Sequence, residues 1–141
     1  MLKSSEYCDN EYLLSKFKEN KVSKQIEILD KGDFKNKKDH LKLYNKIDLA
    51  LDTFPYNGVT TTFEALWMNV PVLVLKGYNF NSRCGESIIA NSGINYLIAE
   101  NQKEYIKKAY HLSQNKEKLN EMRNKLYKNI LLTPLFDTTK Y

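Results

Sequence analysis

The sequence contains few of the residues on which disulfide-linked, metal-binding and membrane-spanning proteins depend. Its two cysteines, Cys8 and Cys84, stand in no CxxC or Cys/His ligand spacing, and its two histidines, His40 and His111, are isolated from each other. No apolar run approaches the roughly 20 residues that cross a bilayer, and the N-terminus lacks the apolar core of a signal peptide. We therefore expect a cytoplasmic protein with no membrane span, no metal site and no disulfide.

A strong charge of one sign is also missing. The net charge is +5, from 22 basic and 17 acidic residues, and the acidic residues interleave with the lysines as on ordinary solvated helix faces. Nucleic-acid binding is therefore the weakest of the functional hypotheses, and we expect no nucleic-acid partner. With 42% apolar residues and a length of 141 residues, the chain is typical of a soluble globular domain.

Apolar spacing along the chain indicates alternating helices and strands. Apolar positions three and four residues apart predict helices over residues 11–20, 36–47, 60–69, 82–93, 101–115 and 116–131. Shorter apolar runs predict strands over residues 25–29, 48–52, 71–76 and 95–99. The third of these runs is apolar on both faces, as in a parallel strand that helices cover on both sides. Gly93 is the expected C-cap of the helix that precedes it.

This alternation, with its short connections, predicts an α/β fold, a Rossmann-like parallel sheet with helices on both faces. Residues 1–141 contain no internal repeat and no low-complexity linker, so we interpret them as a single domain. Residues 133–141 are interpreted as a tail whose Leu135 and Phe136 dock on the core. Trp67 and Phe63 are expected to be core residues.

The junction between the second predicted strand and the helix after it contains more polar residues than a turn requires. Asn57 and Gly58 form the turn, and Thr60, Thr61 and Thr62 follow. A helix that starts at the carboxyl end of a strand presents unpaired N–H groups, which suit phosphate. One hydroxyl can cap the helix while the others donate to phosphate, and Gly58 permits close approach of a ligand. Alternatively, one threonine caps, one packs by its methyl group and one faces water. The local pattern leaves both interpretations open.

Four segments together resemble one glycosyltransferase family. They are LDTFPYNGVTTTFEALWMNVPVLVL, SRCGESII, LIAENQKEYIKKA and PLFDTTKY, in that order along the chain. They are similar to the C-terminal part of the catalytic domain of the protein O-GlcNAc transferase family (SPINDLY-type, tetratricopeptide-repeat-associated), and the resemblance runs from about Gln25 to Tyr141. It implies the C-terminal lobe of a GT-B glycosyltransferase, N-terminally truncated.

The resemblance also implies a set of residues that bind the sugar donor. Thr60 and Thr61 would hold the diphosphate of a UDP-sugar at the helix start, and Glu64 would bind the ribose hydroxyls. His40 matches a histidine that lies against uracil and ribose, and Lys37 matches a lysine near the base. The donor would be UDP-N-acetylglucosamine (UDP-GlcNAc) or a related UDP-sugar, with no other cofactor and no metal.

Asn57 and Gly58 complete the predicted donor-binding set, and Asp52 also fits the family pattern. Val59 departs from the pattern, because some members have a histidine there and valine can neither donate to phosphate nor titrate. Arg83 belongs to a matching motif, in which capping, ion pairing and ligand contact all remain open.

Each of the carried-over roles has an ordinary structural alternative. His40 could be a surface or partly packed histidine, Glu64 an exposed helix residue, and Lys37 one of many solvated lysines. The residues by themselves do not decide between these alternatives and contact with a ligand.

The resemblance implies transfer of a sugar, most often N-acetylglucosamine, from UDP to a protein hydroxyl. The family's acceptor-binding lobe, repeats, catalytic histidine and catalytic lysine would all precede Met1, so the catalytic residues of this chain are unknown. The first hypothesis is a donor-binding lobe, incomplete for catalysis alone, whose partners are a protein acceptor and a missing N-terminal half or tetratricopeptide-repeat protein. The second is a non-catalytic module that binds UDP-sugar or docks to a partner, or a truncated relic.

Overall fold

The computed structural model describes residues 10–29, 36–137 and 139. The chain divides into two compact units, Met1–His40 and Leu41–Tyr141, and each is described by itself. The single domain inferred from the sequence stays a prediction. Cys8 and the tail residues 138, 140 and 141 lie outside the described residues.

The first unit contains the helix α1, Asn10–Glu19, which confirms the first predicted helix. The strand expected at residues 25–29 is wrong. Ser23–Gln25 form a 3-10 helix (η1), and Leu29 alone makes an isolated bridge. An extended apolar segment becomes a strand only when a neighbouring segment pairs along it. The helix α2, Lys37–Lys42, begins in this unit and continues into the 3-10 helix η3, Leu43–Lys46. Together they confirm the helix predicted over residues 36–47.

The second unit is built on a parallel sheet. Its strands are β1 (Ala50–Leu51), β2 (Val72–Leu75) and β3 (Ile98–Ala99), in the order β1-β2-β3. Ala50 is paired with Val72, and Val74 with Ile98. The central strand β2 is buried on both faces, as its continuous apolar run predicts.

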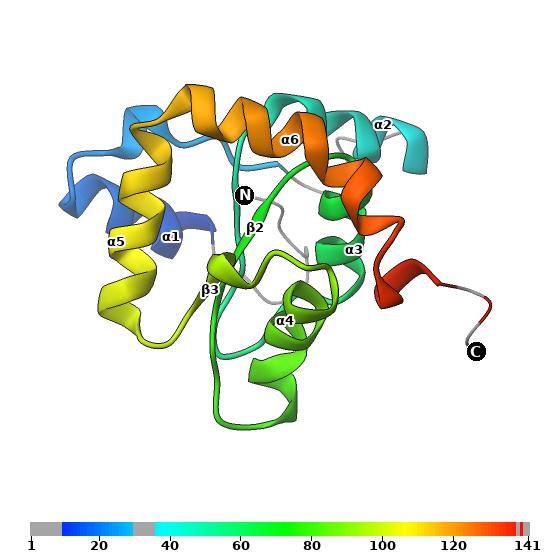
Figure 1. Ribbon diagram of the computed structural model, residues 1–141. Coiled ribbons are helices and arrows are strands. Elements are labelled where there is room, and N and C mark those ends of the chain that lie inside the picture. The colour runs from blue at the N-terminus through cyan, green and yellow to red at the C-terminus, as the bar shows by residue number, and fades with distance from the viewer. Residues whose placement is uncertain (1–9, 30–35, 138, 140–141) are drawn as a thin grey trace. The chain divides into compact units, whose positions relative to one another are not determined.

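Helices cover both faces of this sheet. In Figure 1, α5 lies on one side of the strands and α3 and α4 lie on the other, while α6 runs across one end. The bounds of these helices are Thr60–Trp67 (α3), Phe80–Asn91 (α4), Gln102–Ser113 (α5) and Lys116–Ile130 (α6). Two short 3-10 helices complete the unit, Asn95–Leu97 (η4) and Pro134–Phe136 (η5). No helix in the described part of the chain is long and apolar enough to cross a membrane.

Helix α6 packs against the amino ends of β1 and β2. Arg123 Nη1 donates a hydrogen bond to the carbonyl of Ile47, just before β1. The backbone N–H of Tyr127 donates to Asn69 Oδ1, just before β2, at 3.0 Å. The carboxyl ends of the strands therefore lie at the edge of the sheet opposite α6 (Figure 1).

The C-terminal segment docks on the core as predicted. Leu135 and Phe136 pack against the buried cluster, and Phe136 meets Phe63 edge to face, with ring centroids 6.2 Å apart. Phe63 packs against the core, but the expectation for Trp67 is wrong, because that side chain is 47% exposed. The Trp67 ring instead lies edge-on to Tyr127 at 5.2 Å, at the border of α3 and α6.

The ends of α4 are set by short-range contacts. Asn79 Oδ1 accepts from the Ser82 N–H at 3.0 Å, and the Ser82 hydroxyl accepts from the Asn79 N–H, which forms a capping box. At the other end Ser92 is the C-cap, and Gly93 follows it with φ of +75°, in the left-handed region that favours glycine. Gly93 therefore ends α4 as predicted, although it follows the C-cap residue Ser92 and is not the C-cap itself.

Gly85 sits where α4 comes closest to the sheet. A Cβ added there would lie 2.9 Å from Val74 Cγ1 and would overlap Asp52 Oδ2. We expect Gly85→Ala to lower the free energy of unfolding by about 1–3 kcal/mol, because the buried neighbours have no room to move apart. Urea denaturation would measure the change. Ser87→Ala, on the exposed side of the same helix, should change stability by less than about 0.5 kcal/mol, and equal effects of the two variants would contradict this packing.

Candidate functional site

The candidate site lies at the carboxyl edge of the parallel sheet. The loops that follow β1, β2 and β3 turn at the same end, opposite α6 (Figure 1). Parallel α/β sheets bind ligands at this edge, because loops and helix N-termini gather there. The loop after β1, residues 52–59, leads directly into α3.

Helix α3 begins without a side-chain cap. Val59 occupies the N-cap position, with φ of −110°, and its side chain has no acceptor to offer. The expectation that a threonine caps this helix is therefore wrong, because the helix starts at Thr60 and the capping position falls one residue earlier. Thr62 is buried, 2% exposed, and its hydroxyl donates to the Gly58 carbonyl at 2.8 Å.

Thr60 and Thr61 are both exposed at this open helix start. Within the part of the chain that the structure describes, no hydrogen bond involves either hydroxyl. The N–H groups of the first turn have no intrahelical acceptor, and together they carry a partial positive charge. The structure thus brings these two predicted residues together beside unpaired backbone donors.

Gly58 is required for the tight approach of the loop to α3. A Cβ at this position would overlap Thr61 Oγ1 and would lie 3.3 Å from Thr62 Oγ1. The Gly58 N–H donates to Asp52 Oδ1 at 2.8 Å. Any side chain here would therefore push the loop away from the helix start.

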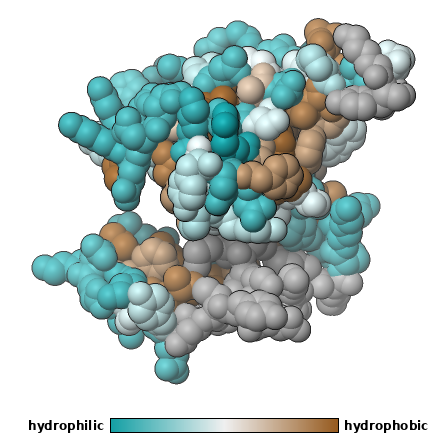
Figure 2. Space-filling model, turned by 90° about the horizontal axis from the view of Figure 1, so that it is seen from below, coloured by the Kyte–Doolittle hydropathy of each residue, from teal (hydrophilic) through white to brown (hydrophobic). Residues whose placement is uncertain are grey.

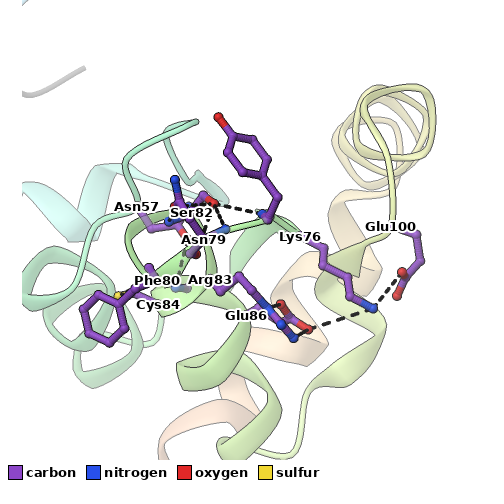
Figure 3. A network of polar contacts seen from close by, with 11 residues as sticks. Asn57, Lys76, Asn79, Phe80, Ser82, Arg83, Cys84, Glu86 and Glu100 are labelled. Carbon is purple, nitrogen blue, oxygen red and sulfur yellow. Dashed lines mark hydrogen bonds and ion pairs between the residues drawn. The ribbon is translucent and has the colours of Figure 1, made fainter.

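Asn57 fastens this loop to α4. The side chain is 2% exposed; Nδ2 donates to the Thr53 carbonyl at 2.9 Å and Oδ1 accepts from the Gly85 N–H at 3.1 Å. Its backbone N–H donates to the Asn81 carbonyl at 3.1 Å. Figure 3 shows Asn57 beside the capping residues Asn79 and Ser82, where the loops from β1 and β2 meet. These contacts shape the loop, and a direct contact of Asn57 with a donor stays a prediction.

Glu64 lies one turn into α3 and is half-buried. Its Oε2 is 3.5 Å from the hydroxyl of Tyr44, which also lies 3.4 Å from the Thr61 carbonyl. Burial, together with the charge of Glu64, raises the pKa of Tyr44 to about 12, so this hydroxyl remains a donor. The apolar spacing placed Tyr44 on the packed face of its predicted helix, but its contact with Glu64 could not be predicted, because it joins segments that are distant in the chain.

Asp52 holds the other end of the loop. Its Oδ1 accepts from the Thr53 N–H at 2.9 Å and from the Gly58 N–H at 2.8 Å. Its Oδ2 is buried and has no hydrogen-bond partner among the described residues. Burial raises the pKa of Asp52 to about 6, although the two N–H bonds act in the opposite direction. In the sequence Asp52 stands out only as part of a motif, because a motif does not show which of its side chains become buried.

Lys37 and His40 both lie on α2, in the part of that helix that belongs to the first unit. The N–H of Asp39 in the same turn donates to Asn36 Oδ1 at 3.0 Å. The predicted helix at this position is confirmed. The roles of Lys37 and His40 near the base and the ribose stay predictions.

A chain of ion pairs borders the site on α4. Arg83 Nε lies 2.8 Å from Glu86 Oε2, and Lys76 Nζ lies 2.9 Å from Glu100 Oε2 and 4.0 Å from Glu86 (Figure 3). Of the roles left open for Arg83, the structure therefore shows ion pairing. These charges are mostly exposed, so the pairs contribute little to stability.

Exposed aromatic side chains surround the same edge, and no spacing or motif in the sequence points to them. They are Phe54 and Tyr56 after β1, and Tyr78 and Phe80 after β2. The rings of Phe54 and Tyr78 meet edge to face at 6.2 Å. A groove of about 770 Å³ begins beside them, between α3 and α4, and Val59, Arg83 and Glu86 are among its lining residues. Figure 2 shows brown hydrophobic residues interspersed with teal polar ones in this view.

Comparison with known proteins gives a consistent result. The sequence profile of glycosyl transferase family 41 matches residues 10–141. The probable UDP-N-acetylglucosamine–peptide N-acetylglucosaminyltransferase SPINDLY of Eustoma exaltatum subsp. russellianum is 35% identical over 103 residues, which are 73% of this chain. The probable UDP-N-acetylglucosamine–peptide N-acetylglucosaminyltransferase SEC of Arabidopsis thaliana is 33% identical over 110 residues, 77% of this chain. The chain spans only 11% of the length of each of these relatives.

The fold is also similar to that of a solved structure, a mutant O-GlcNAc transferase from Thermobaculum terrenum. The superposition has a TM-score of 0.76 at 31% sequence identity, and it covers 92% of this chain and 25% of the other. The predicted Rossmann-like parallel sheet with flanking helices is thereby confirmed.

Replacing Asn57 tests how the loop is held. Asn57→Ala would remove both hydrogen bonds of a buried side chain, to the Thr53 carbonyl and from the Gly85 N–H, so we expect a loss of about 1–3 kcal/mol in the free energy of unfolding. Asn91→Ala is the matched control, because the Asn91 amide is exposed and bonds only to Ser87 in its own helix. It should cost less than about 0.5 kcal/mol in the same urea titration. Similar costs for the two variants would argue against the bridging role of Asn57.

The pKa of Asp52 predicts how stability depends on pH. Because burial raises this pKa from 3.8 to about 6, the folded chain binds more protons than the unfolded chain between these values. The contribution of Asp52 to stability is complete below pH 3.8 and is lost as the pH rises through about 6. Asp52→Asn should therefore gain stability relative to the wild type as the pH rises from about 4 to about 7. Urea unfolding at several pH values measures this difference, and a constant difference would contradict the assignment.

Proposed function

This chain belongs to glycosyl transferase family 41, and we propose that it is the donor-binding part of a protein O-glycosyltransferase. The donor is a UDP-sugar, and UDP-GlcNAc is the first choice because the plant relatives are named for it. The acceptor is a protein hydroxyl. The single observation that carries the proposal is the uncapped start of α3, with Thr60 and Thr61 exposed beside it.

The chemistry of this helix start suits a diphosphate. The unpaired N–H groups and the helix dipole favour an anion by about 0.3–2 kcal/mol. Two threonine hydroxyls can donate to phosphate oxygens next to the backbone, and hydrogen bonds to a charged group are the stronger kind. Gly58 keeps the approach open, because no side chain projects from the loop at that point.

The remaining predicted residues would orient the nucleoside. Glu64 lies one turn further along α3, where a carboxylate accepts from two vicinal ribose hydroxyls. The Tyr44 hydroxyl behind it, 3.5 Å from Oε2, would limit the rotamers of Glu64. His40 and Lys37 are proposed to contact the base and the ribose, on the strength of the family resemblance.

Sugar transfer leaves negative charge on the departing UDP, and the start of α3 would stabilise that charge. A single helix end supplies about 0.3–2 kcal/mol, whereas enzymes lower barriers by about 8 kcal/mol or more. Val59 at the N-cap adds no donor and no titratable group. We therefore assign donor binding to this chain and expect catalysis to need groups beyond those described.

Calorimetric titration with UDP-GlcNAc tests the proposal on the purified chain. We expect a dissociation constant between micromolar and millimolar for the wild type. Thr60→Ala/Thr61→Ala should weaken binding about tenfold or more, because two hydrogen bonds to a charged ligand are lost. Ser113→Ala removes another exposed hydroxyl, at the C-terminal end of α5, and should leave binding unchanged. A folded wild-type chain that does not bind, or a double variant that binds as well as the wild type, would refute the proposed site.

A further inference from the structure

The carboxyl of Asp52 lies directly behind the loop that leads into α3. Its Oδ1 accepts from the Gly58 N–H at 2.8 Å, and Gly58 in turn abuts the hydroxyl of Thr61. Gly58 therefore lies between the Asp52 carboxyl and the proposed diphosphate site, and it contacts both Asp52 and Thr61. A diphosphate at the start of α3 would bring further negative charge close to this carboxylate.

The surroundings of the carboxyl do little to neutralise it. From its own loop it receives the N–H groups of Thr53 and Gly58, and from α4 the backbone of Gly85 covers Oδ2. The hydroxyl of Tyr105, on α5, donates to the backbone carbonyl of Asp52 at 2.9 Å rather than to its carboxyl. Among the described residues no cation forms an ion pair with Asp52, and Oδ2 has no hydrogen-bond donor.

A carboxylate in this position responds to a nearby anion by taking up a proton. Burial already disfavours the charged form, and a second negative charge disfavours it further. The neutral carboxyl still offers an oxygen to the two N–H groups, so the loop keeps its shape. The proton comes from solvent and returns to it when the ligand leaves, and no other bond is formed or broken.

We propose that Asp52 is a positioning residue that couples binding of the donor diphosphate to the uptake of a proton. The inference rests on the proposed function, because it needs the anion at α3. By linkage, a ligand that raises the proton affinity of Asp52 is itself bound more tightly when the proton is present. Affinity for the donor therefore rises as the pH falls from about 8 towards about 6, where Asp52 titrates.

The size of the effect follows from the same linkage. A coupling at the low end of the usual range, a fivefold difference in affinity between the protonated and the charged form, gives about threefold tighter binding at pH 6 than at pH 8. For the same coupling, the number of protons taken up per ligand reaches about 0.4 near pH 6.5. Both quantities are properties of the binding step alone and require no turnover.

Calorimetry in two buffers of different ionisation enthalpy measures the proton uptake directly. The probe is UDP-GlcNAc, whose diphosphate is esterified at both ends. UDP is unsuitable, because its terminal phosphate titrates near a pKa of about 6. We expect the apparent binding enthalpy near pH 6.5 to depend on the buffer, and the affinity to fall as the pH rises. Binding with no buffer dependence and no pH dependence would overturn the coupling while leaving the proposed function intact.

Asp52→Asn separates coupling from a purely structural role. Asparagine keeps the acceptor oxygen for Thr53 and Gly58 but carries no charge. At pH 8 we expect this variant to bind UDP-GlcNAc about fivefold more tightly than the wild type, with no proton uptake. A residue that only held the loop would give weaker binding at every pH. Proton uptake that persists in the variant would come from another group and would overturn the assignment.

Carbon-13 NMR of the Asp52 carboxyl keeps the test independent of whether the variant folds. Titration of the wild-type carboxyl with and without saturating UDP-GlcNAc should show a higher pKa in the complex. An unchanged pKa in a chain that binds the donor would refute the coupling. Absence of binding at any pH by the folded chain would instead refute the proposed function.

Discussion

The loop between β1 and α3 is held by two inward-facing polar side chains, and the candidate site depends on them. Asp52 closes the loop on itself through Gly58, and Asn57 ties it to the backbone of Gly85 on α4. Asp52 and Asn57 form hydrogen bonds with backbone groups of the loop and of α4. The loop therefore keeps its shape without a side chain that caps the start of α3. The first turn of that helix is therefore left open to a ligand.

The two ends of the sheet differ in how far they are covered: α6 packs over the amino ends of the strands, whereas the start of α3 stays open at the carboxyl ends. At the amino ends, α6 covers the strands and takes up backbone and side-chain partners through Arg123 and Tyr127. At the carboxyl ends, α4 and α5 are capped by their own asparagines, Asn79 and Asn101, whereas α3 is capped by no side chain. The hydrogen bonds near the start of α3 come from residues behind the loop, such as Asp52 and Asn57, and leave the hydroxyls of Thr60 and Thr61 exposed.

Local patterns identified most elements of the second unit but not the details that decide its chemistry. The apolar run at β2, the threonine helix and the docking of Phe136 could all be predicted, because each depends on neighbours in sequence or on hydrophobicity alone. The expected strand at 25–29 could not be excluded, since strand formation depends on a partner elsewhere in the chain. Trp67 is 47% exposed although its ring contacts Tyr127 on α6, and no local pattern reports how far a neighbouring helix covers a side chain.

The sequence by itself determined the family and the position of the threonines, because both are written in the order of residues along the chain. Only the tertiary structure decided what surrounds them. It placed Val59 rather than a threonine at the N-cap, brought Gly85 against Asp52, and set Tyr44 beside Glu64. Burial and contact between distant segments arise only when the chain folds, and they set the pKa of Asp52.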